Sequence, residues 1–530
     1  MTPKKKTGLL QRLLSLAAAA ALALSLGGCG TSAVVPGGSA DVVPNPSSTA
    51  ASVDAPFEMH FIDVGQALSV LVECDGQFML YDGGNVDDGS LVVSYLQSQG
   101  VEQLEYVFCS HAHEDHVGGL AAALAAAQTA EGRAHITVLD KNAKVGKKLL
   151  ATGNGRCNLD NRDITPERYF TSSPKALRRL LSAVDEAAPL AWFESLGLYP
   201  RTDETGRVYP YSNQAADVLA LLEHHLARCG VEVRTGCTVQ TLSQSRGGYV
   251  VLFSNADGAD ESLRADAVVC AMGGSAGPQF GTDGFGPRFA AQCGGALAPL
   301  YPCLTALQCA KPDKRLAGIR AKAHAALYSG STLLADYRGE VQFTDYGLSG
   351  ICIMDLTRHL TPAVKSPAVE LDLFPDVAED ALSALFAVRV PLLPGDTAAD
   401  FWLGLLNAKL GRALWQAAGL PDADVHRLSA AQWQKLAHTA KHWRFDGLTP
   451  CGWKQAQVTG GGLALTELEP DFQFKGCPGL YFVGETLDCV GRCGGFNLHW
   501  AFGSGLAAGR SAAKPRRTVP SQKPPRKKKH

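Results

Sequence analysis

Four side chains of types that commonly bind metal ions stand within six residues of the chain: His111, His113, Asp115 and His116. Imidazole and carboxylate groups are usual ligands of Zn²⁺ in catalytic sites. On an extended loop, His-x-His can direct two imidazoles at one ion, and the following Asp-His can serve a second ion about 3.5–4 Å away. Such a pair of ions activates a bridging water, so the string predicts a metal-dependent hydrolytic site.

A second group of residues indicates nucleotide chemistry. Residues 152–158 read Thr-Gly-Asn-Gly-Arg-Cys-Asn, and residues 484–497 contain a Gly-Glu turn and a Gly-Gly pair. Glycine permits positive φ and lets the backbone approach a ligand closely. The run 135–140 ends in Asp140, where a dinucleotide-binding fold places the acid that binds the adenosine ribose hydroxyls. These patterns predict a dinucleotide site downstream of the metal string.

The elements that must position these residues differ on the two sides of Gly118. Upstream, short strands broken by Gly and Asn indicate a β-meander at 57–82, followed by a helix at 91–99 and a strand at 106–109 that leads into the metal string. Downstream, an Ala-rich helix at 120–130 and the strand at 135–140 indicate an α/β fold. Each predicted site therefore belongs to a different kind of fold.

The upstream segment resembles the metallo-β-lactamase fold, specifically the ComEC-like secreted hydrolases. The resemblance rests on the metal string together with the motifs at 61–66 and 81–84, and it covers residues 57–118 only. Members of that fold need a further His and Asp well downstream and a second αβ half. The resemblance thus implies a truncated fragment whose zinc site is incomplete.

Residues 119–512 closely resemble the BaiN-like (YhiN-type) family of NAD(P)/FAD-dependent flavoproteins. Five motifs carry the resemblance in order, at residues 148–158, 206–210, 343–350, 458–462 and 479–502. Chance can explain one glycine cluster but not five in sequence. The resemblance implies an α/β fold, with an FAD-binding Rossmann-like domain and an inserted β-rich plus helical domain.

The resemblance also implies which residues bind FAD. The loop at 153–158 would pass close to the isoalloxazine ring, and Glu485 would contact the ribityl or pyrophosphate region. Gly494, Gly495 and Asn497 would open the last helix, whose positive end can stabilise a reduced flavin. The full expected set is Gly119, Asp140, Lys141, Gly153, Gly155, Arg156, Asn158, Gly273, Gly484, Glu485, Asp488, Gly494, Gly495 and Asn497.

Residues 301–445 are implied to form an inserted substrate or cap domain. Strands are expected at 329–336 and 340–344, and helices at 382–388 and 401–415. We find no cysteine redox pair, Ser/His/Asp order or metal-ligand spacing in this region. Hydride transfer by the flavin itself is therefore expected, with NAD(P)H as the electron donor and a small molecule as the substrate.

The junction at Gly118–Gly119 disturbs the nucleotide loop that the family carries. Aligning the last glycine of Gly-x-Gly-x-x-Gly with Gly119 puts Glu114 and His116 at the first two glycine positions. At about 4 Å and an effective dielectric near 20, a like-charge pair costs roughly 4 kcal/mol. We expect weakened FAD binding, with residues 104–130 acting as a surrogate first β-α unit in the flavoprotein sheet.

The chain ends and cysteines give conflicting expectations for location. Three lysines, an apolar run at 13–26 and Leu-Gly-Gly-Cys29 resemble a bacterial lipoprotein signal, with Cys29 as the lipidated residue; a plain membrane anchor is the alternative. Export is then expected, with membrane contact only through this segment. Yet the cysteines number 15, which is odd, and they include no Cys-x-x-Cys pair. Unpaired thiols are typical of reduced compartments, which fits a cytoplasmic flavoprotein family.

Composition bounds the remaining possibilities. The chain has 530 residues, a net charge of −2 and 19% charged residues, so several domains are expected and a nucleic-acid partner is not. The expected layout is a signal at 1–29, a flexible linker at 30–56, the metallo-β-lactamase-like fragment at 57–118, FAD-binding segments at 119–300 and 446–512 around the insertion at 301–445, and a disordered basic tail at 513–530.

The sequence therefore predicts a flavin-dependent oxidoreductase that uses FAD and NAD(P)H, with FAD affinity impaired at the junction. Two alternatives stay open: a metal-dependent hydrolase of metallo-β-lactamase fold, and a non-functional chimera. The absence of a linker between His116 and the following helix favours a chimera that arose as an assembly artefact over a real fusion.

Overall fold

The computed structural model describes residues 57–61, 70–74, 77–81, 106–108 and 117–514, apart from 246–247, 394, 396 and 422–423. Its contacts divide the chain between Ser110 and His111 into two units, each of which is described by itself. Several predicted features lie outside the described residues, namely the signal with Cys29, the linker, the helix at 91–99 and the metal string His111, His113, Asp115 and His116.

The first unit contains a four-stranded sheet of order β1-β2-β3-β4. Its strands are β1 (Phe57–Phe61), β2 (Val70–Cys74), β3 (Gln77–Tyr81) and β4 (Tyr106–Phe108). The first three are antiparallel neighbours, as expected for a meander, and β4 runs parallel to β3. The prediction that residues 104–130 form one β-α unit of the flavoprotein sheet is therefore wrong. The reason is that β2 covers only one edge of β3, which leaves the other edge for β4.

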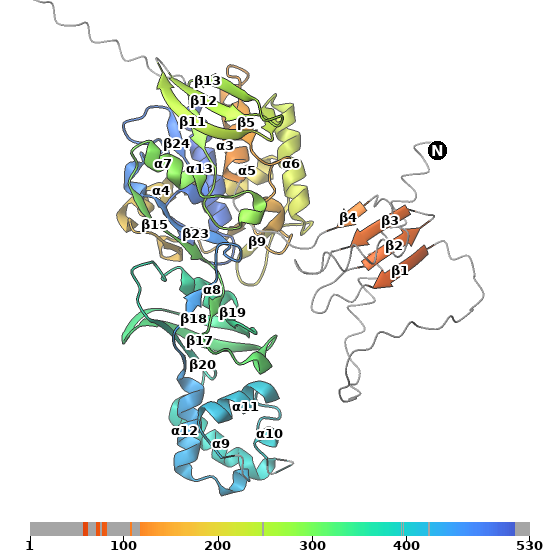
Figure 1. The fold of residues 1–530 in the computed structure, drawn as a ribbon, viewed down its shortest axis with the longest axis vertical. Coiled ribbons are helices and arrows are strands. Elements are labelled where there is room, and N and C mark those ends of the chain that lie inside the picture. Colours follow the sequence, from red (N-terminus) through yellow and green to blue (C-terminus); the bar gives the residue numbers. More distant parts are fainter. Residues whose placement is uncertain are drawn as a thin grey trace, which may run out of the picture. The chain divides into compact units, whose positions relative to one another are not determined.

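The second unit begins with α3 (Val117–Ala130) and β5 (Thr137–Asp140), which confirm the helix and strand predicted at 120–130 and 135–140. β5 pairs in parallel with β10 (Glu232–Thr235), and β14 (Val268–Cys270) pairs in parallel with β24 (Leu480–Phe482). The second pair joins segments far apart in sequence, so the body that the sequence predicts to bind FAD, called the FAD-binding body below, is built from both ends of this unit (Figure 1).

The last helix, α13 (Phe496–Ala512), lies against α3 and forms the centre of this body. Small residues make the close approach possible. A Cβ on Gly505 would lie 2.2 Å from the carbonyl oxygen of Gly118, and one on Gly509 would lie 2.1 Å from that of Ala122. Because α13 is buried on most of its sides, it is apolar nearly all round.

Further elements complete the FAD-binding body. They are β6 (Asp160–Asn161), β7 (Tyr169–Phe170), α4 (Pro174–Ala187), α5 (Pro189–Ser195), β8 (Pro200–Thr202), β9 (Arg207–Pro210), α6 (Ala215–Arg228), β11 (Thr238–Ser245), β12 (Gly248–Ser254), β13 (Asp260–Ala265), α7 (Phe285–Gln292), β15 (Leu297–Cys303), β23 (Val458–Leu463) and β25 (Val490–Gly491). β15 and β23 are antiparallel neighbours, and they flank the insertion.

The insertion contains a seven-stranded sheet of order β21-β20-β17-β18-β19-β16-β22 and a group of helices. Its strands are β16 (Leu307–Gln308), β17 (Arg320–Ser329), β18 (Thr332–Phe343), β19 (Gly347–Ser349), β20 (Pro367–Asp372), β21 (Trp443–Phe445) and β22 (Thr449–Pro450). Its helices are α8 (Ile351–Thr357), α9 (Glu379–Arg389), α10 (Ala398–Phe401), α11 (Ala408–Ala417) and α12 (Ala430–Lys441). The β-rich and helical halves predicted for this region are confirmed.

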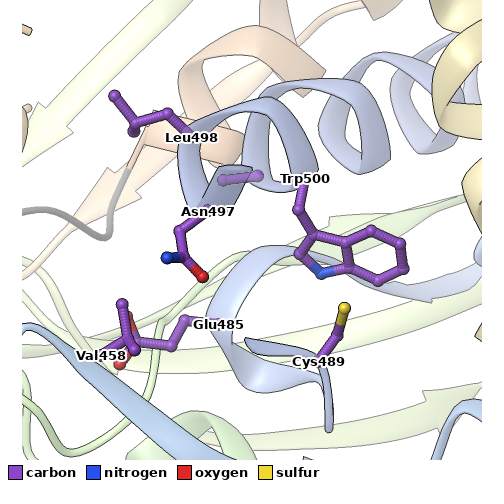
Figure 2. A pocket seen from close by; sticks show the side chains of 7 residues that line it. Val458, Glu485, Cys489, Asn497, Leu498 and Trp500 are labelled. Atoms are coloured by element: carbon purple, nitrogen blue, oxygen red, sulfur yellow. The ribbon is translucent and has the colours of Figure 1, made fainter. Parts of the chain in front are cut away.

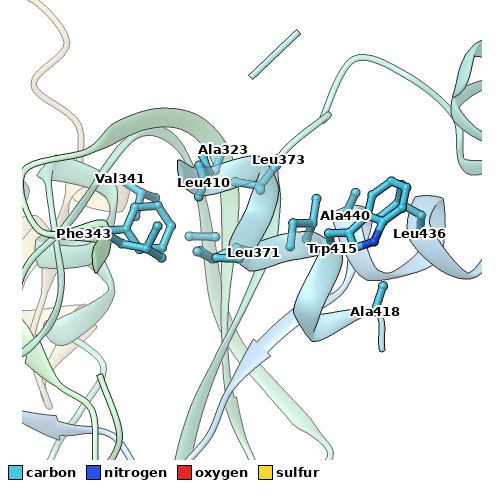
Figure 3. Close-up of a cluster of buried hydrophobic side chains, with 14 of the residues drawn as sticks. Ala323, Val341, Phe343, Leu371, Leu373, Leu410, Trp415, Ala418, Leu436 and Ala440 are labelled. Carbon is cyan, nitrogen blue, oxygen red and sulfur yellow. The ribbon is translucent and has the colours of Figure 1, made fainter. Parts of the chain in front are cut away.

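One helix boundary in the insertion differs from the prediction. The single helix expected at 401–415 is two helices, α10 and α11. Gly404 between them has φ +72°, and the Asn407 side chain accepts a hydrogen bond from the amide of Lys409 to start the second helix. Apolar periodicity continued across this break because both helices pack into one core, part of which is shown in Figure 3.

Among the described residues, no helix is both long enough and apolar enough to cross a membrane.

Candidate functional site

Lys148 and Glu485 form an ion pair in the interior of the FAD-binding body. Lys148 is fully buried, and its Nζ donates to the carbonyl of Ala276 at 3.0 Å and lies 3.3 Å from Glu485 Oε2. The Glu485 side chain is 9% exposed. Burial raises the pKa of this carboxyl, while the charge of Lys148 opposes that rise. A buried pair of this kind is tolerated only when its other polar atoms are also satisfied.

The second oxygen of Glu485 is satisfied through Thr459 on β23. Glu485 Oε1 accepts from the Thr459 amide at 3.0 Å and from its hydroxyl at 2.6 Å. The same hydroxyl oxygen accepts from the amides of Ser275 and Ala276, at 2.7 and 3.0 Å. A Cβ on Gly274 would lie 2.2 Å from this hydroxyl. The network therefore fixes four separate chain segments around one ion pair.

A small cavity of about 20 Å³, roughly the size of one water molecule, adjoins Glu485. Figure 2 shows Asn497 and Trp500 of α13 on one side of it, above the turn that carries Glu485 and Cys489. The Asn497 side chain is itself held, since its Oδ1 accepts from the Gly491 amide at 2.8 Å. The start of α13 is thus tied to the segment that precedes it.

The loop at 153–158 has an unusual backbone. Gly153, Asn154, Gly155 and Cys157 all have φ between +57° and +77°. For a residue with a side chain this conformation costs about 1–2 kcal/mol, so Asn154 and Cys157 store strain of the kind found at ligand sites. The backbone of this loop is therefore sharply curved. A curved backbone without bulky side chains can approach a flat ring closely, as the predicted contact with the isoalloxazine ring requires.

This loop and the Gly-Gly pair before α13 lie side by side. In the amide orientation that satisfies both ends of the side chain, Asn158 accepts from the Gly495 amide at 3.1 Å. Gly495 has φ +100°, and a Cβ there would lie 2.2 Å from the carbonyl oxygen of Asp160. Only glycine fits this position. The structure thus brings together the two glycine blocks that the sequence places about 340 residues apart.

A charged histidine lies in the first turn of α13. His499 Nδ1 lies 2.9 Å from an oxygen of Asp160, and its Nε2 lies 3.5 Å from one of Asp185. Burial by itself would lower the pKa of His499, but the two carboxylates outweigh it and raise the pKa to about 9. The two carboxylates balance the charge of the imidazolium, so it is the amide groups at the start of α13 that suit an anionic ligand.

A second polar cluster joins the insertion to the FAD-binding body just before the Gly-Gly pair. Asp355 of α8 is fully buried and accepts from Arg492 Nε at 3.0 Å and from the Cys493 amide at 2.7 Å. The Arg492 guanidinium lies 4.4 Å from the ring centre of Tyr337. Because Arg492 and Cys493 directly precede Gly494, this cluster adjoins the start of α13.

Tyr337 is the centre of this cluster. Its hydroxyl accepts from Arg358 at 2.7 Å and lies 3.0 Å from His359 Nε2. Burial, with the charge of Arg358, lowers the pKa of His359 to about 4, so the imidazole is neutral near pH 7. A hydrogen bond then joins the phenol and the imidazole, and the histidine tautomer decides which of the two donates. We name Arg358, Arg492, Tyr337 and His359 the seam cluster.

Other residues of the predicted cofactor set have contacts of their own. Asp140 Oδ1 accepts from the Asn142 amide at 2.8 Å, and Lys141 Nζ lies 2.8 Å from Asp283. Both lie at the end of β5. A Cβ on Gly119 would lie 3.1 Å from the Cβ of Ala271, the residue directly after β14. This glycine therefore lets α3 pack closely against the end of β14.

The remaining predicted residues serve the local structure in ways the sequence did not show. Asp488 is buried and accepts from the hydroxyl of Thr171 and from the amide of Ser172, at 3.2 and 2.9 Å. Arg156 donates to the carbonyl of Gly153 and lies 5.1 Å from the ring centre of Tyr209. Gly273 and Gly484 have φ +66° and +63° at two turns of the site.

Parallel strands, a glycine loop and a helix N-terminus at one site define the class of Rossmann-like, dinucleotide-binding proteins. Residues 117–511 match the family described as HI0933-like protein Rossmann domain, and the chain belongs to this family. It is a flavin-dependent oxidoreductase with FAD as its cofactor. This confirms the family, fold class and enzyme class predicted from the sequence.

Two curated relatives and one solved structure illustrate the similarity. A 3-dehydro-bile acid delta(4,6)-reductase of Clostridium scindens is 36% identical over 401 residues, covering 74% of this chain and 96% of that protein. A ribosomal RNA dihydrouridine synthase of Escherichia coli is 24% identical, covering 73% and 94%. The 3-ketosteroid-Δ4-(5α)-dehydrogenase structure from Rhodococcus jostii RHA1 has a TM-score of 0.40 and 15% identity, covering 76% of this chain and 96% of that chain.

The geometry of the described residues, taken without the comparisons, suits the binding of FAD. Thr152 Oγ1 is buried and has no hydrogen-bond partner among the described residues, directly before the strained loop. Gly495 leaves space that any other side chain would fill, and the charged His499 lies one turn further along. The loop at 152–158 and the start of α13 would hold the flavin end of the cofactor.

Sequence reasoning missed three parts of this site: the Lys148 ion pair, the charge on His499 and the seam cluster. Lys148 and His499 stand inside motifs that were recognised, but their partners lie 337 and 339 residues away. A lysine followed directly by Leu149 and Leu150 was the one available signal for the first. The seam cluster had none, because it forms only when two domains meet.

Proposed function

We propose that this chain reduces a carbon–carbon double bond conjugated with a carbonyl, in a small and largely apolar molecule, with NAD(P)H as the electron donor. Both curated names support this reaction class. A delta(4,6)-reductase of a 3-dehydro-bile acid acts on double bonds next to a ring ketone, and making dihydrouridine saturates the double bond beside a uracil carbonyl.

This reaction makes three demands on an active site. A hydride must reach the β-carbon, negative charge on the carbonyl oxygen must be stabilised, and a proton must reach the α-carbon. FAD, when bound and reduced, supplies the hydride. Preorganised cations and hydrogen-bond donors meet the second demand, and a positioned acid meets the third.

The observation that carries the proposal is the seam cluster. It combines two guanidinium groups with a phenol that is hydrogen-bonded to an imidazole, beside the Gly-Gly pair that opens α13. Arg492, whose Nε is held by Asp355, would stabilise the carbonyl oxygen. Tyr337 would deliver the proton and regain one through His359.

A small apolar substrate is favoured over RNA. The relative acting on a bile acid shares 36% of its residues with this chain, against 24% for the one acting on ribosomal RNA. Phe170 and His359 stack edge to face at 4.8 Å, which puts an aromatic ring beside the seam cluster. A net charge of −2 provides little attraction for a polyanion.

The test uses the full chain loaded with FAD, reduced without oxygen by NADH or NADPH. A steroid with a 3-oxo-4,6-diene and a uridine-containing ribosomal RNA fragment are then added separately, and flavin reoxidation is followed. We expect rapid reoxidation with the steroid and a product two mass units heavier. Reoxidation by neither compound would overturn the proposal, and reoxidation by RNA alone would replace its substrate class.

A matched pair of variants tests the seam cluster. Tyr337→Phe should leave FAD content and reduction by NAD(P)H unchanged, yet slow reoxidation by the steroid about 100-fold, as expected when a general acid is lost. Tyr199→Phe is the control, because Tyr199 is 72% exposed and stacks only on Tyr211 among its described ring contacts. Equal rates for both variants would remove Tyr337 from the mechanism.

A further inference from the structure

The helical half of the insertion carries a cluster of imidazole and carboxylate groups that the proposed reaction does not use. Glu379 is the first residue of α9, His438 lies in the last turn of α12, and His442 is the residue that directly follows α12. His438 Nδ1 lies 3.1 Å from Glu379 Oε1, and His442 Nε2 lies 3.4 Å from Glu379 Oε2. Two helices thus converge on a space bounded by two ring nitrogens and a carboxylate.

The two separations from Glu379 are close to those between ligands of one metal ion. Zn²⁺ binds nitrogen and oxygen ligands at about 2.0–2.2 Å in tetrahedral geometry, which puts neighbouring ligand atoms about 3.3–3.6 Å apart. The ligand atoms of Glu379, His438 and His442 all lie within 4.8 Å of one another. The rings of His438 and His442 lie side by side, with their centres 4.7 Å apart. Little rearrangement is needed to close the site.

A fourth residue orients one of the imidazoles. His442 presents Nε2 to Glu379, while its Nδ1 lies 2.9 Å from Oε1 of Glu370 on β20. Histidines that bind metals nearly always give their second nitrogen to a carboxylate or carbonyl in this way, which fixes the ring and its tautomer. This contact uses the second nitrogen of a proposed ligand, and Glu370 comes from a different element.

We propose that Glu379, His438 and His442 form a Zn²⁺ site, with Glu370 as a positioning residue. Two nitrogens and a carboxylate suit Zn²⁺ better than Mg²⁺ or Ca²⁺, which prefer all-oxygen sites. His438 is 63% exposed, so the fourth position is open to water. The ion would link α9 to α12 across the surface of the insertion core, where Phe386 and Leu436 are buried.

The test must separate this site from the histidines at 111, 113 and 116. The background is therefore the full FAD-loaded chain carrying His111→Ala, His113→Ala and His116→Ala, stripped of metal by a chelator and dialysed. Zinc is titrated by calorimetry, and Co²⁺ replaces it for absorbance spectra that report nitrogen ligation. We expect one equivalent of Zn²⁺ and a higher unfolding temperature with zinc present.

Variants in the same background decide the outcome. Glu379→Gln and His438→Ala should each abolish the stoichiometric equivalent, and Glu370→Gln should weaken it about 10- to 100-fold. His135→Ala is the control, because it removes an exposed histidine that faces a carboxylate, Glu232, in another domain. FAD content and circular dichroism verify folding of every variant.

Two results would overturn the proposal. One is no zinc binding at 100 µM by the background protein, whose folding the bound flavin verifies. The other is an equivalent of zinc that survives Glu379→Gln and His438→Ala together. Neither result bears on the reductase proposal, since flavin reoxidation is measured separately and without added metal.

Discussion

At the scale of single residues, the Lys148–Glu485 pair has the largest expected effect on stability. Removing one partner of a buried pair leaves the other charge uncompensated, which typically costs about 3–5 kcal/mol. Lys148→Met should therefore lower the free energy of unfolding by that amount in a denaturant titration. Arg320→Met is the matched control, because its pair with Glu340 is exposed and such pairs contribute about 0–1 kcal/mol.

Equal losses for the two variants would show that Lys148 is no more important than a surface charge. A smaller loss for Lys148→Met than for the control would mean that the network around Thr459 keeps Glu485 satisfied without the ammonium group.

His499 gives the chain a pH-dependent contribution to stability. Its pKa is about 9 in the folded protein, against an ordinary value of 6.5, so folding favours the protonated form. The contribution is fully present below about pH 6.5 and is lost as pH rises through about 9. Its size is on the order of 3 kcal/mol. His499→Gln should lose most of the fall in unfolding free energy between pH 6.5 and 9.5 that the parent protein shows.

Asp185→Asn provides a graded comparison, because this carboxylate is the more distant of the two at 3.5 Å. We expect it to reduce the pH dependence only in part. A parent protein whose stability is flat across this window would contradict the charged state assigned to His499.

At the scale of elements, the contact between α3 and α13 depends on backbone touching backbone. Gly505→Ala adds a Cβ 2.2 Å from the carbonyl oxygen of Gly118, which belongs to a helix and cannot move aside. Overpacking of this kind costs about 1–3 kcal/mol and outweighs the gain of roughly 1 kcal/mol in helix propensity. Thermal unfolding followed by circular dichroism should show a net loss.

Gly452→Ala is the control for that substitution. Its Cβ would meet no atom within 4 Å, and its φ is not in the left-handed region, so we expect no loss and a small gain from the less flexible unfolded chain. If Gly505→Ala were as stable as this control, α3 and α13 would not pack as closely as described.

Local pattern sufficed to predict some elements and failed for others. The helix at 120–130 and the strand at 135–140 were predictable because each has one consistent period and a clear end. The stretch 401–415 is predicted as one helix, but it is two. The helices on both sides of the break pack into the same core, so the apolar spacing continues across the break and does not reveal it. The strand at 106–108 pairs with β3, a choice of partner that no local pattern encodes.

The candidate site was predictable where glycine is required and unpredictable where charges meet. Positive φ at Gly153, Gly155 and Gly495 follows from the motifs themselves. The partners of Lys148, His499 and Tyr337 are distant in sequence, and only the tertiary fold selects them. The metal-ligand spacing on α12 was overlooked because one pair of histidines a turn apart is common and becomes informative only beside Glu379.

At the scale of the whole molecule, the junction before α3 sets the expected affinity for FAD. Glu114 and His116 stand where the family carries glycines, and these positions lie outside the described residues. Glu114→Gly together with His116→Gly should tighten FAD binding by about 100- to 1,000-fold, which corresponds to the roughly 4 kcal/mol of one like-charge contact. Quenching of flavin fluorescence during titration measures it.

The control is Glu131→Gly, which removes an exposed acid with φ +50° at the other end of α3. Submicromolar FAD binding by the parent chain, with no gain in the double variant, would show that the junction tolerates the substituted loop.

The way the insertion leaves and rejoins the FAD-binding body has a consequence for protein engineering. Cys303 on β15 pairs with Val458 on β23, and the Cys451 amide donates to the carbonyl of Ala306. The segment that leads into the insertion therefore lies beside the segment that leads out of it. We therefore expect that residues 307–450 can be exchanged as a cassette between relatives without breaking the nucleotide fold, provided that the cassette keeps the Asp355 that holds Arg492. If the insertion is the substrate domain that the sequence predicts, a transplanted cassette brings its own substrate preference.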